Sequence, residues 1–281
     1  MKKIGFVDYF LNEWHADNYP DMIANATNGE YKVCYAYGHI EPSPESGLKS
    51  NAQWAEEHGI ELLESIEEVI EKSDFLVVLS PDNPEMHEEL CDLPLKSGKP
   101  TYIDKTFAPD KESAIRIFQN AEAHGTPCYS TSALRFSAEL EEIDTDNIYK
   151  IYSEGPASLS IYVIHQLEPI VRLMNSRAKR LMFLGDVVHP SMIIEFADGR
   201  YAQIYHRDDE AMGFRITTVD QNNKAKHYEI KSDYFGRFIQ GMIKFFETGV
   251  APVSHEQTID VIALRTAAIQ AASTPFEWIE L

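Results

Sequence analysis

Positive charge is scarce in this sequence relative to negative charge. Its 281 residues contain 25 Lys and Arg against 45 Asp and Glu, which gives a formal net charge of −20. Nucleic acids and anionic membrane surfaces are bound through basic patches, so the composition argues against both as partners. No apolar run approaches the roughly 20 residues that cross a membrane, and the start Met1-Lys2-Lys3 leads into a short strand-like segment, not a signal peptide. We therefore expect a cytoplasmic protein.

Cysteine is also scarce. Cys34, Cys91 and Cys128 are odd in number and lack the spacing of a metal site. We interpret them as reduced, mostly buried thiols and predict no bound metal. With 44% hydrophobic residues the chain can bury a sizeable core, and its length suggests about two domains.

Two charged residues stand where a buried strand is expected to end. The residues Phe75 to Leu79 are apolar without alternation, as in a parallel strand covered on both faces, and a second such strand ends at Asp104 and Lys105. Ligands of open α/β sheets bind at the carboxyl ends of the strands. Lys105 is therefore a candidate for chemistry, and the alternative is an exposed loop lysine beside an acid.

A series of short sequence motifs is distributed over nearly the whole chain. The segment Ser80-Pro81-Asp82-Asn83-Pro84-Glu85-Met86-His87 is similar to Thr-Pro-Asn-x-x-His with one extra residue, and 98–106 is similar to Gly-Lys-x-x-x-x-Glu-Lys-Pro. Arg135, His165 with Glu168 three residues on, and 252–256 before an Ala-rich helix follow in order. Together they resemble the glucose-fructose oxidoreductase / inositol dehydrogenase (Gfo/Idh/MocA) family of NAD(P)-dependent enzymes that act on sugars and polyols.

The resemblance implies roles for individual residues. Lys105 and His165 are the implied catalytic pair, with Lys105 as the cation that holds the alcohol oxygen and His165 as the base. The implied substrate contacts are Arg135, Tyr162 and Glu168. The implied cofactor is NAD or NADP, and its cleft is lined by Asp8, Phe10, Ser80, Pro81, Asn83, His87 and Asp104.

Glycine is missing where that cofactor would need it. A dinucleotide-binding turn requires Gly-x-Gly-x-x-Gly after the first strand, because side chains would keep the backbone from the pyrophosphate. After the strand 3–7 the three glycine positions hold Asp8, Phe10 and Glu13. The second strand, 31–37, ends in Gly38-His39 instead of the acid that would bind the adenosine ribose. Two carboxylates would face the pyrophosphate, which predicts weak cofactor binding.

His165 is the second chemical candidate. Leu167, Ile170, Val171 and Met174 form a helical stripe, and Pro169 suits only a first turn, so the helix is expected to begin near residues 165–168. In related dehydrogenases an aspartate stands four residues before the histidine, whereas this chain has Ile161. The alternatives are a partly buried histidine satisfied by backbone, a Glu168 paired with Arg172, and a Tyr162 that belongs to a strand or the core.

The patterns predict an α/β protein. A Rossmann-like, doubly wound parallel sheet is expected over 1–128, with helices near 65–72 and 110–124 and a last strand at 128–131. An α+β domain with a mostly antiparallel open sheet is expected over 129–281. Its predicted elements are the hairpins 191–206 and 214–231 and the helices 234–248 and 254–272.

Two functions remain open at this stage. One is a divergent NAD(P)-dependent oxidoreductase that acts on a sugar-like or polyol substrate. The other is a non-catalytic relative that binds a small metabolite or a protein partner without NAD(P). In either case we predict a homodimer through the antiparallel sheet, because the strands 193–196 and 201–205 carry apolar or aromatic side chains on both alternating sets.

Overall fold

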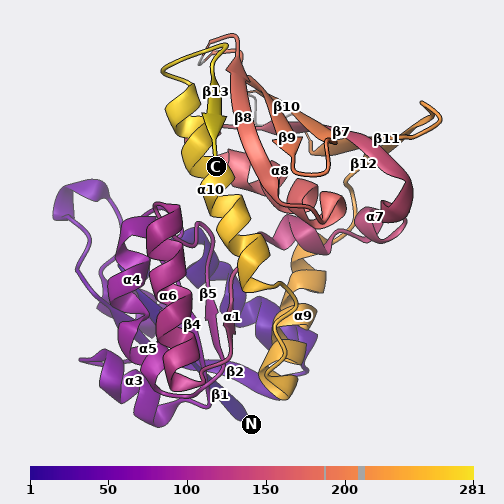
Figure 1. Cartoon of the computed structure of the whole chain (residues 1–281). Coiled ribbons are helices and arrows are strands. Elements are labelled where there is room, and N and C mark those ends of the chain that lie inside the picture. Colours follow the sequence, from indigo (N-terminus) through magenta and orange to yellow (C-terminus); the bar gives the residue numbers. More distant parts are fainter. Residues whose placement is uncertain (187, 208–212) are drawn as a thin grey trace. The chain divides into compact units, whose positions relative to one another are not determined.

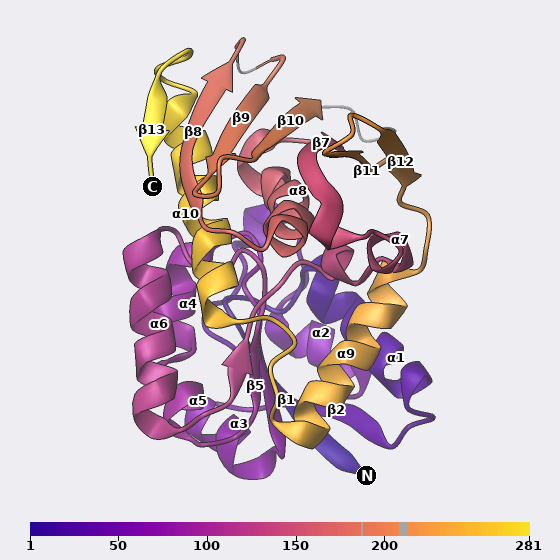
Figure 2. The same cartoon turned by 45° about the vertical axis from the view of Figure 1, so that its right-hand side comes forward.

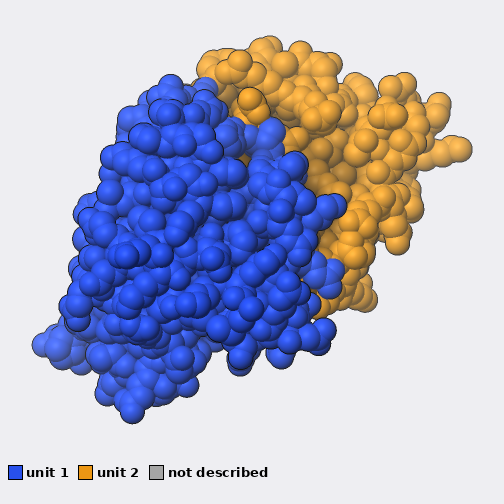
Figure 3. Space-filling view, turned by 90° about the horizontal axis from the view of Figure 1, so that it is seen from below, with its two compact units in different colours: residues 1–131, 239–255 blue, residues 132–238, 256–281 orange. Residues whose placement is uncertain are grey.

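The structure is a computed structural model that describes residues 1–186, 188–207 and 213–281 (Figure 1). It contains two compact units, which Figure 3 distinguishes by colour: 1–131 with 239–255, and 132–238 with 256–281. The predicted domains 1–128 and 129–281 stay a prediction. Within the described residues, no helix has both the length and the apolar character needed to cross a membrane.

The first unit is built on a six-stranded parallel sheet in the order β3-β2-β1-β4-β5-β6. Strands β2 and β3 lie on one side of β1, and β4, β5 and β6 lie on the other. The order therefore reverses between β1 and β4, and in α/β sheets ligands bind at the carboxyl ends of the strands at such a switch point. The predicted buried strand is β4, in which Leu76, Val77 and Val78 are fully buried. The strands are β1 (Lys2–Asp8), β2 (Tyr31–Gly38), β3 (Glu61–Leu62), β4 (Phe75–Val78), β5 (Thr101–Ile103) and β6 (Cys128–Tyr129).

Helices lie on both sides of this sheet, with α3, α5 and α6 on one side and α1 and α9 on the other (Figure 2). Local signals define several ends: Ser65 Oγ accepts from the N–H of Glu68, and Asp110 Oδ1 accepts from the N–H of Ser113. The helices are α1 (Trp14–Ala26), η1 (Pro44–Ser46), α2 (Asn51–His58), α3 (Ile66–Lys72), η2 (Pro84–Met86), α4 (His87–Leu90), α5 (Asp92–Lys96), α6 (Lys111–His124) and the part of α9 (Tyr234–Thr248) from residue 239 on.

A late segment of the chain completes the core of the first unit. Phe246 of α9 stacks on Phe75 with ring centroids 4.8 Å apart, and Phe245 meets Tyr129 edge-on at 4.7 Å. Phe245 and Phe246 are buried. The apolar face of α9 therefore covers β4 and β6, some 120 to 170 residues earlier in the sequence.

The second unit is built on a seven-stranded mixed sheet in the order β12-β11-β7-β10-β9-β8-β13. Strand β7 runs parallel to β10, and the other neighbouring pairs are antiparallel. The two predicted hairpins are confirmed as β9–β10 and β11–β12. The strands are β7 (Ile148–Pro156), β8 (Ala178–Leu184), β9 (Ser191–Phe196), β10 (Tyr201–Arg207), β11 (Arg215–Asp220), β12 (Ala225–Glu229) and β13 (Trp278–Glu280).

Helix α8 (Leu159–Met174) packs on β7 and β10, and it begins earlier than predicted. The expected start near residues 165–168 is wrong, because Pro169 lies inside the helix. An internal proline costs about 3 kcal/mol, but the stripe from Val163 to Val171 is buried and its burial outweighs that cost. The other helices are η3 (Ala133–Phe136), α7 (Ala138–Glu141), η4 (Thr145–Asn147) and α10 (His255–Ala271).

The predicted fold class is confirmed. A Rossmann-like parallel sheet with helices on both faces is followed by an α+β unit whose sheet is mostly antiparallel.

Candidate functional site

The candidate cofactor residues of the first unit gather at the carboxyl edge of its sheet. Asp8 is the last residue of β1, Ser80 and Pro81 follow β4, and Asp104 and Lys105 follow β5. The parallel strands stay hydrogen-bonded up to this edge. The N–H of Leu79 donates to the carbonyl of Val7, and the N–H of Asp104 donates to the carbonyl of Val78. The order of the strands therefore places these side chains at one edge, as predicted for the carboxyl ends of parallel strands.

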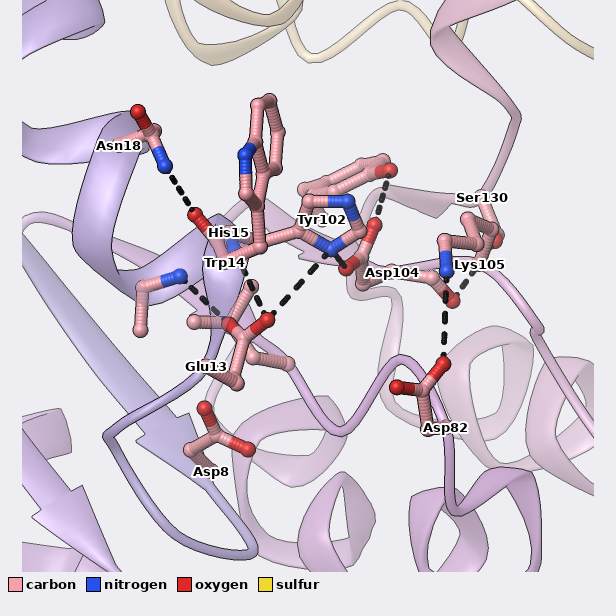
Figure 4. A network of polar contacts seen from close by, with 12 residues as sticks. Asp8, Glu13, Trp14, His15, Asn18, Asp82, Tyr102, Asp104, Lys105 and Ser130 are labelled. Atoms are coloured by element: carbon pink, nitrogen blue, oxygen red, sulfur yellow. Dashed lines mark hydrogen bonds and ion pairs between the residues drawn. The ribbon is translucent and has the colours of Figure 1, made fainter. Parts of the chain in front are cut away.

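Glu13 caps the helix that begins at this edge. Its carboxylate accepts from the N–H of His15 at 2.7 Å and from the N–H of Ala16 at 2.5 Å (Figure 4). The amino terminus of the first helix is where dinucleotide-binding folds hold a pyrophosphate, because free N–H groups and the helix dipole attract an anion. In this chain a carboxylate of its own takes that position.

Asp8 is a buried acid beside Glu13 (Figure 4). Its Oδ1 accepts from the N–H of Tyr9 at 2.7 Å, whereas Oδ2 has no hydrogen-bond partner within the described chain. Burial, followed by the nearby charge of Glu13, raises the pKa of Asp8 well above its usual value. Burial also raises the pKa of Glu13, to about 7, with a further contribution from Asp104 and an opposing one from His15.

Asp104 pairs with His15. The Nδ1 of His15 contacts Oδ2 of Asp104, and the hydroxyl of Tyr102 lies 2.9 Å from Oδ1 (Figure 4). Burial by itself would raise the pKa of Asp104, but the charge and hydrogen bond of His15 outweigh it, followed by Lys105 and Tyr102, and the pKa is lowered. Asp104 is therefore an ionised, buried carboxylate that holds the imidazole of His15. Sequence reasoning missed His15, although Glu13 and His15 at the start of the helix that follows the first strand were a readable signal.

Lys105 pairs with Asp82. Its Nζ lies 3.8 Å from Oδ1 of Asp82, and its side chain is 13% exposed against 65% for Asp82. Figure 4 shows the Lys105 and Asp82 side chains extended toward one another. The peptide bond between Lys105 and Thr106 is cis. The lysine is thus neither the exposed loop lysine of the alternative interpretation nor a partner of the Asp8–Glu13 pair.

The remaining cofactor candidates make contacts within the first unit. Ser80 Oγ donates to the carbonyl of Asn83 at 3.2 Å. His87 is fully buried, and its ring nitrogens lie 3.1 Å from the carbonyl of Phe107 and 2.6 Å from that of Leu79. Burial lowers the pKa of His87. Phe10 is half-buried, with its ring 5.9 Å from that of Tyr9.

The side chain of Asn51 packs against Gly38, the last residue of β2. Asn51 was not among the site residues predicted from the sequence. It is buried, its Oδ1 accepts from the N–H of Leu11, and its Nδ2 donates to the carbonyl of Ile40. A Cβ added at Gly38 would lie 2.5 Å from the Asn51 amide. Gly38 therefore admits Asn51, which ties the turn after β1 to the loop after β2.

These residues do not fit NAD or NADP in the usual pose. The N–H groups of His15 and Ala16 already bond to Glu13. The raised pKa values of Asp8 and Glu13 show that this edge disfavours negative charge, so a pyrophosphate beside them would be unfavourable. Asn51 fills the space beside Gly38, at the end of the strand where an acid would bind the ribose.

In the second unit His165 has an oriented ring. Its Nδ1 lies 2.7 Å from Oγ of Ser132, the buried residue that caps η3. A serine hydroxyl can donate or accept, so it orients the ring with either nitrogen carrying the proton. Tyr162 lies one turn earlier on α8, with its ring centroid 5.2 Å from that of His165, and 39% of Tyr162 is exposed. The contact with Ser132 orients the His165 ring in a chain that has Ile161 four residues before the histidine.

Arg135 and Glu168 form a buried ion pair in the same unit. Nη1 of Arg135 lies 3.2 Å from Oε2 of Glu168, and Oε1 of Glu168 accepts from the N–H of Ser132 at 3.2 Å. Gln257 Oε1 accepts from Nη2 of Arg135. The alternative of a Glu168–Arg172 pair on a solvated face does not hold, because Glu168 is buried and Arg172 donates to the carbonyl of Arg135. The proposed substrate residues Arg135 and Glu168 therefore adjoin His165 through Ser132.

The site residues belong to both units. Asp8, Phe10, Ser80, Pro81, Asn83, His87, Asp104 and Lys105 lie in the first, and Arg135, Tyr162, His165 and Glu168 lie in the second. Their roles stay predictions. Within residues 1–186, 188–207 and 213–281, no group of three or more His, Cys, Asp or Glu side chains has an arrangement that could hold a metal ion.

Comparison with known proteins gives matches in structure and none in sequence. No protein-family model matches the chain, and no curated protein matches it. GenD2 from gentamicin A biosynthesis, solved in complex with NAD, superposes with a TM-score of 0.78 at 11% identity, over 100% of this chain and 96% of that one. A myo-inositol dehydrogenase from Corynebacterium glutamicum gives 0.78 at 13% identity, over 100% and 99%.

A third structure gives the same result. A putative myo-inositol dehydrogenase from Sinorhizobium meliloti superposes with a TM-score of 0.76 at 13% identity, over 100% of this chain and 99% of that one. At such low identity the likeness concerns the fold. The chain has the fold of the inositol and sugar dehydrogenases of the Gfo/Idh/MocA type, over its full length.

Proposed function

We propose that this protein binds a small polyol or sugar-like metabolite and that it does so without NAD(P) in the usual pose. The observation that carries the proposal is the Glu13 carboxylate on the N–H groups of His15 and Ala16. A pyrophosphate would have to displace this cap and then lie beside Asp8. The ligand class rests on analogy with inositol and sugar dehydrogenases of the same fold.

Calorimetric titration tests this proposal. We expect binding of at least one polyol, such as myo-inositol or sorbitol, in the absence of any dinucleotide. Titration with NAD(H) and NADP(H) is expected to give dissociation constants weaker than micromolar. Micromolar or tighter binding of either dinucleotide would overturn the cofactor-free assignment.

A second candidate is a divergent NAD(P)-dependent oxidoreductase acting on a sugar-like alcohol. The observation that favours it is the contact between Ser132 and His165, which keeps the imidazole oriented without the family's aspartate. In this function Lys105 would hold the alcohol oxygen and His165 would take its proton. If a substrate is found, Lys105→Met should lower kcat/KM by about 100-fold or more, since a cation acting on a reacting oxygen is lost. A change of less than a few-fold would exclude Lys105 from the chemistry.

A further inference from the structure

The carboxyl edge of the first sheet carries more negative than positive charge. Asp8, Glu13 and Asp104 converge there, and the basic side chain beside them is His15, which pairs with Asp104 (Figure 4). Lys105 lies closer to Asp82. Nδ1 of His15 also lies 3.9 Å from Oε2 of Glu13, so Glu13 shares this histidine with Asp104. Within the described residues, Asp8 has no basic side chain at ion-pair distance.

Oδ2 of Asp8 is buried without a hydrogen-bond partner within the described residues. Asp8 as a whole is 1% exposed. An acceptor that is buried and unsatisfied is costly, so native structures normally supply a donor, an ion or a proton there. The side chain of Asp8 extends toward that of Glu13 in Figure 4, so a donor bound to the Asp8 carboxyl group would lie near Glu13 as well.

The cluster is nearly buried. The side chains of Glu13 and His15 are 12% and 9% exposed and Asp8 is 1% exposed, so a ligand would approach from the side of Glu13 and His15. Its position at the carboxyl ends of β1 and β5 is where open α/β sheets bind ligands. A group with several N–H donors and a positive charge would satisfy Asp8 Oδ2 and offset the charge of Glu13.

We propose that this edge binds the positively charged nitrogen of a small ligand, of the class of amino polyols or amino sugars, in the place where dinucleotide-binding proteins of this fold hold a pyrophosphate. The Asp8–Glu13 pair reverses the charge preference of the site from anion to cation. An ammonium group fits this chemistry better than a metal ion, because the described residues offer no group of three ligands with metal geometry. The polyol part of this ligand rests on the proposed function, whereas its positively charged nitrogen is inferred from Asp8 and Glu13.

Two matched pairs of ligands test the charge separately from the polyol. Glucamine (1-amino-1-deoxysorbitol) is compared with sorbitol, and ethanolamine with ethylene glycol, by calorimetry and ligand-observed NMR at pH 8. At this pH the amines are charged, and Glu13, with its pKa of about 7, is mostly ionised. The pKa of Asp8 is raised well above its usual value by burial and by Glu13, and a bound ammonium group would lower it. We expect each amine to bind at least 10-fold more tightly than its neutral partner.

The isosteric variants Asp8→Asn and Glu13→Gln should each reduce that preference to within about 2-fold. Asp92→Asn is the matched control, because Asp92 is a surface acid that pairs with Lys96, and it should keep the wild-type preference. Thermal melting of each variant checks that it is folded. If Asp8→Asn and Glu13→Gln keep the 10-fold preference, the amine binds elsewhere and the proposal is overturned.

The ligand pairs also separate this proposal from the proposed function. Equal binding of glucamine and sorbitol would overturn the cation site and leave polyol binding standing. Binding of both amines without either neutral partner would support the cation site and count against polyol binding. Saturable binding of Mg²⁺, Mn²⁺ or Zn²⁺ alone that is lost in Asp8→Asn, with no preference for amines, would assign the cluster to a metal and overturn the proposal.

Discussion

At the scale of single residues, Glu13 links the candidate site to the pH dependence of stability. Burial raises its folded-state pKa to about 7, above the value in the unfolded chain. A raised carboxyl pKa favours the folded state at low pH, and that contribution is lost as the pH rises through about 7. The loss from this one residue is about 2 to 3 kcal/mol between pH 5 and pH 8.

Urea unfolding at pH 5, 6, 7 and 8 measures this effect. Glu13→Gln removes the titrating group. The free energy of unfolding of the variant minus that of the wild type should therefore increase as the pH rises. Glu71→Gln, at an exposed position of α3, serves as the control and should follow the wild type. Parallel pH profiles for wild type and Glu13→Gln would show that Glu13 does not titrate in this range.

Ser132 is the residue on which the orientation of His165 depends. Its hydroxyl contacts Nδ1 of His165 and also accepts from the N–H of Leu134. Ser132→Ala removes both contacts, and we expect a loss of about 1 to 2 kcal/mol in the free energy of unfolding. Ser160→Ala, which changes an exposed serine on α8, the helix of His165, should cost less than about 0.5 kcal/mol. A Ser132→Ala variant as stable as the control would mean that the contact contributes nothing.

At the scale of elements, the turn between β1 and α1 decides whether the sheet edge accepts an anion. Replacing Asp8, Phe10 and Glu13 together by glycine removes both carboxylates and frees the N–H groups of His15 and Ala16. We expect NAD(P) affinity to rise by at least 10-fold over the wild type, measured by calorimetry. Phe10→Gly alone leaves both acids in place and should give no gain. If the triple variant also gains nothing, these positions do not correspond to the glycines of a dinucleotide-binding turn.

At the scale of the whole molecule, the outer face of the second sheet predicts association. Tyr149 and Tyr152 of β7 and Tyr201 and Tyr205 of β10 are each more than one third exposed. Tyr149, Tyr152 and Tyr201 line a shallow hollow of about 320 Å³ together with Trp278. An aromatic face of this kind favours burial against a partner, and we propose a homodimer formed by two such sheets.

Light scattering at micromolar concentration measures the mass. The expected value is twice the 32.0 kDa of one chain, and a Tyr201→Lys, Tyr205→Lys double variant should shift it toward the monomer. Lys32→Glu, a charge change in the first unit, should leave the mass unchanged. A wild-type mass near 32.0 kDa that does not change on concentration would exclude the dimer.

Lys105 and His165 are predicted to reach one cavity although they lie in different units. A crystal structure with a bound polyol would show both side chains within hydrogen-bonding distance of the ligand. Side chains directed to opposite faces of the protein would contradict this prediction and the second candidate function together.

The sequence by itself determined the elements and the class of fold. Unbroken apolar runs specify β4, alternation and turn residues specify the β9–β10 hairpin, and Asp110 and Gly125 define the ends of α6. These signals are local, since each depends on the preferences of a few adjacent residues. The absence of glycine at Asp8, Phe10 and Glu13 was equally readable, and it predicts weak dinucleotide binding.

Only the tertiary structure decided which side chains meet. Ser132 reaches His165 from 33 residues away, Gln257 reaches Arg135 from 122 away, and Asp104 reaches His15 across the sheet edge. Burial of the α8 stripe likewise outweighed the local penalty of Pro169 and extended the helix toward its start. Contacts between distant residues and the burial of charge depend on how strands and helices pack, which no local pattern specifies, and the state of Asp8 and Glu13 follows from that packing.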